Sequence, residues 1–284
     1  GLLVLPAAAG AAGPDGSPLR AYALSVASSR AAIIAGDAVL RRTPLTGRGA
    51  LALPAVSVVV SSKRPDLVET CLDHLGAQTY PSYEIVLGAH GYDVDERLRS
   101  RWSERTGGRL RVVRVPAEAT LGEVLGRLSR LADGDLLTKV DDDDHYGPSH
   151  LTDLVLARRT SGADLVSKSS RWTHFADEGV TIDRVRMAPE VFDVTPAGAT
   201  MLLPRDVLAE AGGWSASVRH VDTDLLARLH AIGAVRYQTH ALEYIYVWRS
   251  TGHTWAADHA ALLEQGGEVF EGLPPLLLDA TVPY

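Results

Sequence analysis

The sequence is poor in cysteine, in clusters of positive charge and in long apolar runs. Its one cysteine, Cys71, has no partner for an internal disulfide, which argues against a small disulfide-stabilised secreted domain. The net charge is −7 and Lys and Arg form no block, so the chain lacks the electrostatic footprint of a nucleic-acid-binding protein. No stretch reaches the roughly 18 to 20 apolar residues that span a bilayer, and we expect no transmembrane segment.

The composition is that of a folded protein. Of the 284 residues, 46% are hydrophobic and 22% are charged, which suffices for the core of one large or two small domains. We expect Cys71 on a helix, buried beside Leu72 and Leu75, which fits a reducing, cytoplasmic environment. The opening residues Gly1 to Leu5 lack the basic flank of a secretory signal, and the missing initial Met suits a segment of a longer protein.

Two regions differ in texture along the chain. Residues 1–53 are rich in Ala, Gly and Pro, and we interpret them as an N-terminal extension to which the sequence assigns no role. From Pro54, short apolar runs alternate with amphipathic helices, which is typical of an α/β domain with a largely parallel sheet. This domain covers residues 54–284, with a first half of about 54–150 and a second half of about 151–284.

The elements follow from apolar periodicity and from helix start and stop signals. Pro65 suits the first position of a helix, and Gly212-Gly213 ends another. A hairpin over residues 171–186, turning near Asp177-Glu178-Gly179, predicts antiparallel strands in the second half. The other predicted strands are 56–60, 84–87, 110–115, 136–140, 164–167, 234–238 and 244–247, and the other helices are 121–131, 148–159, 204–211 and 222–231.

Four consecutive aspartates, Asp141 to Asp144, directly follow the predicted strand 136–140. Adjacent like charges repel one another unless a cation neutralises them. In open α/β sheets the ligand site lies beyond the carboxyl ends of the strands, which is where these residues fall. An oxygen-only ligand set suits Mg²⁺ or Mn²⁺ bridging a diphosphate, so we predict a divalent metal site here.

Three other interpretations of the aspartates compete with this one. An EF-hand loop starting at Asp141 needs Gly at its sixth position and Glu at its twelfth, where the sequence has Tyr146 and Thr152. A phosphatase with an aspartyl nucleophile usually carries Thr or Val two residues on, where His145 stands. A solvated acidic turn is the plainest alternative and stays open.

Six ordered segments resemble the inverting family 2 glycosyltransferases, over a stretch from about Val56 to Trp255. Each segment is a weak signal by itself, but six in the family's order make a specific match. In Gly122 to Arg127, Gly126 stands where the family has alanine. The segments are Val56 to Pro65, Ala77 to Val86, Gly122 to Arg127, Ala132 to Pro148 with the Asp-x-Asp motif at Asp141-Asp142-Asp143, Gly212-Gly213-Trp214, and Val221 to Leu225.

The resemblance implies a GT-A fold, which is Rossmann-like with a mixed, mainly parallel sheet flanked by helices. It implies hexosyl transfer from a nucleotide-diphosphate sugar with Mn²⁺ or Mg²⁺, donor binding in the first half and acceptor binding in the second. By this resemblance Asp141 holds the ribose side of the nucleotide, Asp143 the metal, and Asp222 is the catalytic base. The other residues singled out are Ser61, Arg64, Arg127 and Asp142 for the donor, His253 for the metal, and Trp214 and His220 for the acceptor.

Several of these residues have a simpler alternative role. Asp222 could cap the helix that it begins, and His253 could be a loop histidine with local hydrogen bonds. Trp214 could fill the core, and Arg64 and Arg127 could form surface salt bridges. The sequence leaves these alternatives open.

Departures from the family pattern limit what the resemblance implies. The acidic pair that commonly ends the second strand is replaced by Ala89-His90, so the base of the donor is not assigned. Val221 replaces the first acid of the Glu-Asp pair before the helix. The Gln-x-x-Arg-Trp motif of processive synthases is absent, which favours transfer of a single sugar. The acceptor, whether glycan, lipid or small molecule, and the oligomeric state are not assigned.

Two further functions stay open beside the glycosyltransferase. The lost base-reading acids and the unexplained N-terminal region favour a non-catalytic nucleotide- or sugar-binding module of a larger protein. A metal-dependent phosphatase or nucleotidyltransferase using the same aspartates is a third, weaker hypothesis.

Overall fold

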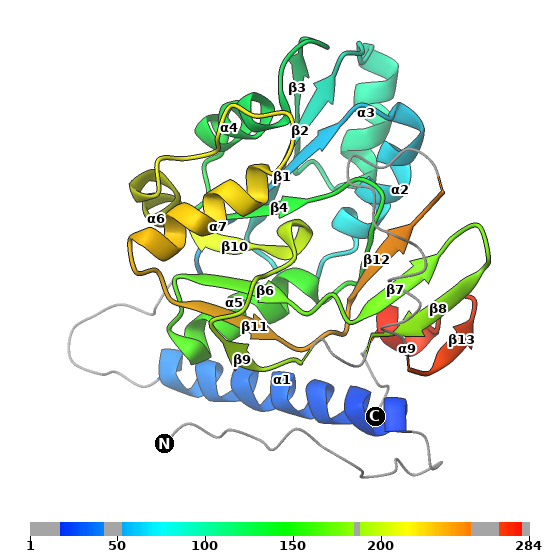
Figure 1. Cartoon of the computed structure of the whole chain (residues 1–284), viewed down its shortest axis with the longest axis vertical. Coiled ribbons are helices and arrows are strands. Elements are labelled where there is room, and N and C mark those ends of the chain that lie inside the picture. The colour runs from blue at the N-terminus through cyan, green and yellow to red at the C-terminus, as the bar shows by residue number, and fades with distance from the viewer. Residues whose placement is uncertain (1–17, 43–52, 185–187, 251–266, 280–284) are drawn as a thin grey trace.

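The central sheet is organised around strands whose side chains alternate between two buried faces. The computed structural model describes residues 18–42, 53–184, 188–250 and 267–279 (Figure 1). These residues form an eight-stranded sheet in the order β3-β2-β1-β4-β10-β6-β11-β9. Its strands are β1 Val56–Ser62, β2 Tyr83–His90, β3 Leu110–Val115, β4 Leu136–Val140, β6 Leu165–Lys168, β9 Val191–Phe192, β10 Leu202–Pro204 and β11 Arg236–Thr239.

The first four strands are parallel, and the other half of the sheet is mixed. Strands β3, β2, β1 and β4 pair in parallel, whereas β10 runs antiparallel to both β4 and β6. Strand β11 is parallel to β6, and β9 is antiparallel to β11. The expectation of a mixed, mainly parallel central sheet is therefore confirmed.

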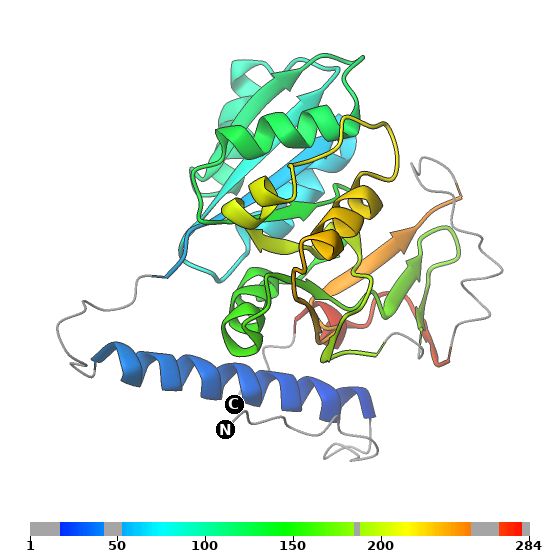
Figure 2. The ribbon, with the colours of Figure 1, turned by 60° about the vertical axis from the view of Figure 1, so that its left-hand side comes forward.

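Helices cover both faces of this sheet. Val58 and Val60 of β1 face a core built with α2, α3 and α5, while Val59 faces the core built with α4, α6 and α7. Figure 2 shows α4, α6 and α7 together on one face. Cys71 is buried on α2, as predicted. The helices are α2 Pro65–Gly76, α3 Glu96–Arg105, α4 Leu121–Leu131, α5 His150–Ser161, α6 Arg205–Glu210 and α7 Val221–Ala231.

A second, smaller sheet accompanies the central sheet. The predicted hairpin is present as β7 Trp172–Phe175 and β8 Val180–Asp183, which pair antiparallel. The described order is β13-β8-β7-β12-β5, in which β12 pairs in parallel with β7. The remaining members are β5 His145–Tyr146, β12 Tyr244–Trp248 and β13 Val269–Glu271.

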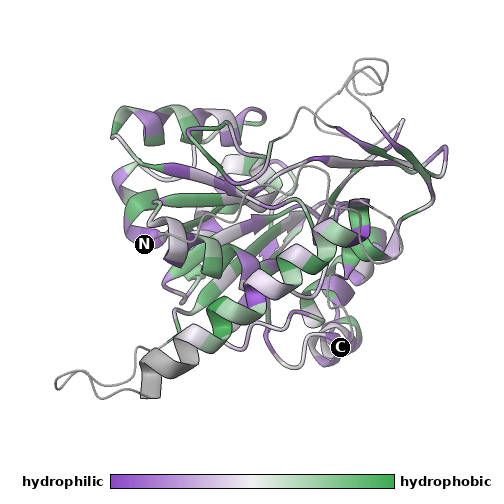
Figure 3. Cartoon of the chain, turned by 90° about the horizontal axis from the view of Figure 1, so that it is seen from below, coloured by the Kyte–Doolittle hydropathy of each residue, from purple (hydrophilic) through white to green (hydrophobic). Residues whose placement is uncertain are grey.

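The N-terminal region contains a long helix that the sequence analysis did not predict, α1 Pro18–Arg42. It packs against α5 and against the short helix α9 Pro275–Leu278, and Ala23 and Val26 are buried in that contact. Figure 3 shows α1 crossing beneath the domain, with apolar and polar residues mixed along it. We find no helix among the described residues with the length and apolar character needed to cross a bilayer.

Arg30 of α1 reaches into a cluster of buried charges. Its guanidinium lies 2.7 Å from Asp153 Oδ1 and 3.2 Å from Glu243 Oε1, two carboxylates that are 2% and 0% exposed. Lys168 Nζ donates to the same Asp153 at 2.7 Å, so two cations compensate two anions. Burial lowers the pKa of the neighbouring His240, and Lys168 lowers it further. Helix α1 is therefore attached to the domain by buried ion pairs as well as by apolar contacts.

We predict that Arg30→Met destabilises the protein by about 3–5 kcal/mol, because it leaves two buried carboxylates with one cation. Urea unfolding followed by circular dichroism measures the loss. Arg97→Met, at an exposed position of α3, is the matched control and should change stability by about 0.5 kcal/mol or less. Equal stability of the two variants would contradict the compensating role of Arg30.

Candidate functional site

Parallel pairing of β1 and β4 brings their carboxyl ends together. Val60 lies opposite Val140 in the register, so the residues after each strand share one edge of the sheet. The segment after β1 contributes Ser62 and Arg64, and the segment after β4 contributes the four aspartates. These are the segments that the sequence analysis assigned to the donor.

Asp142 and Asp143 are held by the segment after β1. Both the Ser62 hydroxyl and the Arg64 guanidinium donate to the buried carboxylate of Asp142, and Arg64 Nη1 lies 2.8 Å from Asp143 Oδ2. Burial raises the pKa of Asp142, although the hydrogen bonds from Arg64 and Ser62 oppose that shift. Burial lowers the pKa of Arg64, but its contacts with Asp142 and Asp143 outweigh this and raise it, so Arg64 stays charged.

Asp144 connects the acidic segment to the second sheet. Its carboxylate is buried and accepts hydrogen bonds from the Tyr244 hydroxyl at 2.8 Å and from the Val247 amide at 2.9 Å. Burial raises the pKa of Asp144, and the charges of Asp143 and Asp141 add to the effect. Arg249, just beyond β12, donates to the backbone carbonyl of Asp143 at 3.2 Å. These contacts fix the end of β12 against the acidic segment.

Asp141 is joined to Asp222 through a lysine that the sequence analysis missed. Lys139 Nζ lies 2.9 Å from Asp141 Oδ1 and 3.1 Å from Asp222 Oδ2, and its side chain is 5% exposed. Burial lowers the pKa of Lys139, but Asp141 and Asp222 raise it by a larger amount, so the ammonium stays charged. A charged residue inside the apolar strand Leu136–Val140 was the signal available in the sequence.

The environment of Asp222 differs from that of a helix cap. The N-cap residue of α7 is His220, in a left-handed conformation with φ 60°, and no side chain caps the helix. Asp222 Oδ2 accepts from Lys139, whereas Oδ1 is buried without a hydrogen-bond partner in the described part of the chain. The capping alternative for Asp222 is therefore wrong.

Two histidines border the acidic segment. His145 Nδ1 and His74 Nε2 lie 3.4 Å apart. Burial and the neighbouring His74 lower the pKa of His145 to about 4, so its ring is neutral at pH 7. Burial also lowers the pKa of His74. His253, the predicted metal ligand, lies outside the described residues.

The remaining candidates are more dispersed. Trp214 is half-buried, packs against the core that α4 covers and donates from Nε1 to Ser129 Oγ at 2.9 Å. Arg127 is exposed on α4, and His220 is exposed before α7. Ser61 is half-buried at the end of β1, next to Ser62. The structure thus groups Arg64, the aspartates and Asp222, and gives Trp214 another environment.

The donor set fits a divalent cation only when the substrate completes it. No group of three His, Cys, Asp or Glu side chains suited to a metal occurs in the described residues. Asp143 is 13% exposed and shares Arg64 with Asp142. Mg²⁺ in phosphate-binding sites commonly takes one or two carboxylates together with substrate phosphates and water. A metal site with one protein carboxylate, completed by phosphates and water, is compatible with Asp143 as the metal ligand.

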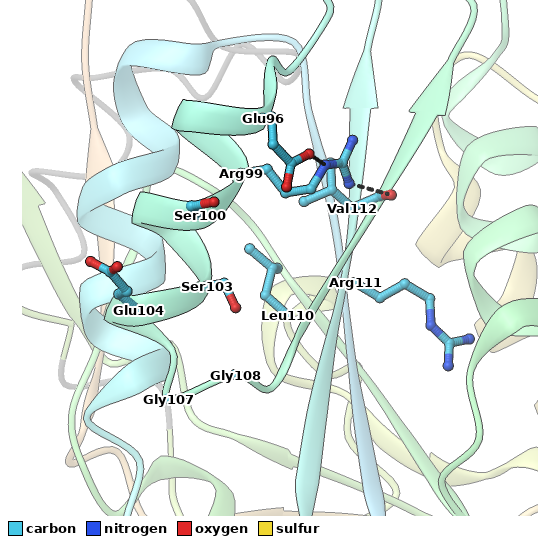
Figure 4. Close-up of a pocket in the computed structure, with 10 residues that line it drawn as sticks. All are labelled: Glu96, Arg99, Ser100, Ser103, Glu104, Gly107, Gly108, Leu110, Arg111 and Val112. Carbon is cyan, nitrogen blue, oxygen red and sulfur yellow. Dashed lines mark hydrogen bonds and ion pairs between the residues drawn. The ribbon is translucent and has the colours of Figure 1, made fainter.

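Neither of the two best-formed surface grooves includes these residues. The larger, of about 720 Å³, lies between α3 and the edge strand β3 and is lined by residues such as Arg99 and Val112 (Figure 4). Strands β2 and β1 separate that edge from β4. The other groove includes Asp135 and Leu136 at the opposite end of β4 from Asp141. The acidic end of β4 is therefore the candidate site because of its charged side chains and not because it lies in either groove.

A comparison with protein families gave a match to the first part of the domain. Residues 57–183 match the profile described as "Glycosyl transferase family 2". The resemblance to the family 2 glycosyltransferases is therefore confirmed over these residues. The comparison with curated proteins gave no match.

Solved glycosyltransferase structures share the fold of this domain. The mannosyltransferase PcManGT from Pyrobaculum calidifontis, in complex with GDP-Man and Mn²⁺, aligns with a TM-score of 0.56 and 17% identity, covering 92% of this chain and 79% of that one. S. aureus TarS 1-349, in complex with UDP-GlcNAc, aligns with a TM-score of 0.52 and 15% identity, covering 74% of this chain and 64% of that one. The fold of the family 2 domain is GT-A, as the sequence implied.

The neighbouring Asp143 and Asp144 should respond differently to truncation. Asp144→Ala leaves a buried hydroxyl and a buried amide without an acceptor, and we expect a loss of about 2–4 kcal/mol in unfolding free energy. Asp143→Ala also relieves repulsion within the acidic segment, so we expect a change of about 1 kcal/mol or less. Urea titrations of both variants measure the difference, and a larger loss in Asp143→Ala would contradict it.

Proposed function

We propose that this protein is a metal-dependent, inverting glycosyltransferase that moves one hexosyl group from a nucleotide-diphosphate sugar to an acceptor hydroxyl. The observation that carries the proposal is the convergence of Asp222 with the acidic end of β4 through Lys139. This convergence supports Asp222 as a base next to a diphosphate site at the aspartates. The GDP-Man and UDP-GlcNAc complexes of the similar structures support a sugar nucleotide as donor.

In the proposed reaction Asp222 Oδ1 takes the proton of the acceptor hydroxyl as its oxygen attacks the anomeric carbon. The new glycosidic C–O bond forms as the bond to the β-phosphate oxygen breaks, and the nucleoside diphosphate leaves with the electron pair. Attack from the side opposite the leaving group inverts the configuration. Two observations support this role: the Asp222 side chain is 31% exposed, and its Oδ1 accepts no hydrogen bond from the described residues, which leaves a lone pair for the proton.

The donor would be bound by the aspartates after β4 and by Arg64. Asp141 and Asp142 would contact the nucleotide, and Arg64, which is charged and half-buried, would contact the diphosphate. Asp143 would hold Mn²⁺ or Mg²⁺, with His253 as a second protein ligand. The metal would supply positive charge for the departing diphosphate. Arg64 would exchange Asp143 for a phosphate oxygen when the donor binds, because both are anionic acceptors for the guanidinium.

Metal-dependent donor binding is testable without an acceptor. We expect Mn²⁺ to increase the melting temperature in the presence of a nucleoside diphosphate, because a ligand that binds only the folded state stabilises it. Asp143→Ala should abolish the Mn²⁺-dependent part of that increase. Glu210→Ala, at an exposed position of α6, is the control and should keep it. An unchanged Mn²⁺ response in Asp143→Ala would remove this residue from the metal site.

Removal of the base tests the chemical step. Asp222→Asn keeps the size of the side chain but cannot accept the proton, so transfer should fall by about 10³-fold, while donor affinity changes little. Release of nucleoside diphosphate in the presence of an acceptor panel measures the rate, and calorimetry measures the affinity. Full activity of Asp222→Asn would exclude it as the base.

The same measurements separate the other two functions. Tight, metal-dependent nucleotide binding without turnover against any acceptor would support a binding module. Release of nucleoside monophosphate, in place of diphosphate, would support a phosphatase or nucleotidyltransferase.

A further inference from the structure

Strand geometry directs Lys139 toward the helix that carries Asp222. Lys139 lies opposite Val59 in the β1–β4 register, and Val59 faces the core that α7 covers. Successive side chains of a strand point to opposite faces, so Lys139 shares this face with Leu137. Its amide also donates to the Met201 carbonyl at 3.3 Å, which fixes the backbone at this point. The ammonium therefore has a defined direction before any ligand binds.

The ammonium determines how close two carboxylates can lie. Asp141 Oδ1 and Asp222 Oδ2 are both within 3.1 Å of Lys139 Nζ, although they come from segments about 80 residues apart. Two carboxylates that both lie this close to one ammonium repel each other strongly in a partly buried site. With the cation between them, each carboxylate instead gains a charge-assisted hydrogen bond. Removing the cation leaves the repulsion without compensation.

A glycine limits the other side of Asp222. A Cβ atom on Gly198 would lie 1.9 Å from Asp222 Oδ2 and 2.4 Å from its Cγ. Gly198 begins the short helix η1, Gly198–Thr200, whose Ala199 carbonyl accepts a hydrogen bond from Tyr146 OH at 3.1 Å. The same hydroxyl accepts from the Asp141 amide at 3.0 Å. The backbone beside Asp222 is thus attached to the acidic segment.

These contacts act on one oxygen of Asp222 and leave the other without a hydrogen-bond donor among the described residues. Oδ2 lies between the ammonium and the glycine backbone, and Oδ1 is buried without a partner in the described residues. A carboxylate held by one oxygen has only one rotational position for the other. We infer that Lys139 and Gly198 are positioning residues that fix Asp222 Oδ1 toward the acceptor hydroxyl. This inference rests on the proposed role of Asp222 as base.

Lys139→Met tests the cationic contact, because methionine keeps the volume and removes the charge. A misplacement of about 1 Å at a reacting group can cost about 100-fold in rate, so we expect kcat to fall by about that factor. Because Lys139 also contacts Asp141, the donor dissociation constant, from calorimetry with nucleoside diphosphate and Mn²⁺, should increase too, but by a much smaller factor than the fall in kcat. The melting temperature of the variant distinguishes mispositioning from unfolding. A parallel loss of donor affinity would assign Lys139 to the donor site and overturn the inference.

Gly198→Ala tests the same position without changing any charge. The added methyl group displaces Asp222, so kcat should again fall about 100-fold while donor affinity stays the same. Gly36→Ala is the matched control, since a Cβ there meets nothing within 4 Å. It should keep wild-type kcat. Wild-type kcat in Gly198→Ala would contradict the inference even if Lys139→Met fails to fold.

The results for Asp222→Asn separate the two proposals. If wild-type protein transfers sugar and Asp222→Asn does not, but Lys139→Met and Gly198→Ala are both fully active, the base is correct and its positioning is wrong. If Asp222→Asn is fully active, the proposed base itself is wrong. If Lys139→Met and Gly198→Ala lose kcat, their effects should largely disappear in the Asp222→Asn background, because they act through that residue.

Discussion

Four negative charges on consecutive residues are the constraint on which the site depends. Each carboxylate at the end of β4 needs a donor, and the donors come from three places in the chain. Asp142 and Asp143 share Arg64, Asp141 pairs with Lys139, and Asp144 accepts from β12. Satisfying these charges therefore attaches the first strand, the acidic segment and the second sheet to one another. The contacts that neutralise the carboxylates are therefore also the contacts that assemble the site.

The carboxylates differ because their partners differ. Asp144 is 5% exposed and hydrogen-bonded to neutral donors, whereas Asp141 has a side chain that is 42% exposed and one charged partner. Neutral buried donors fix a group in place, and a partly exposed ion pair leaves it accessible to a ligand. Identical residues in sequence thus differ in the structure, with Asp144 buried and fixed and Asp141 partly exposed.

A similar principle attaches the N-terminal helix. Arg30 enters a buried cluster in which Glu243 accepts from the Ser149 amide at 2.7 Å, a few residues beyond the acidic segment. Asp153 in the same cluster contacts Lys168 and His240. Helix α1 consequently contributes a buried charge, Arg30, to a cluster in the body of the domain. Composition alone, rich in small residues, gave no sign of this contact.

The sequence predicted the elements whose local signals agree with their final environment. Strands β3 and β4 and helix α4 have the expected bounds, because their apolar patterns match the faces that they bury. Helix α3 was missed since Trp102 is its only fully buried residue and its other positions are mostly polar. Strand β10 was missed because Pro204 ends a three-residue run that is held only by its neighbours. The place of the aspartates at the edge of the sheet followed from parallel strand pairing, which the alternation of strands and helices predicts.

The role of Lys139 could not be derived in the same way. Periodicity assigns it to a buried face, but one of the two carboxylates that make burial of an ammonium favourable lies about 80 residues later in α7. Asp222 likewise occurs in a pattern compatible with a helix cap, and only the three-dimensional structure gives its oxygens different surroundings. One is held by a cation and the other is buried without a donor in the described chain. An unpaired buried acceptor is costly, and such a cost is characteristic of sites that bind another molecule. Asp222 Oδ1 is therefore both the unpaired acceptor and the atom that we propose takes the proton.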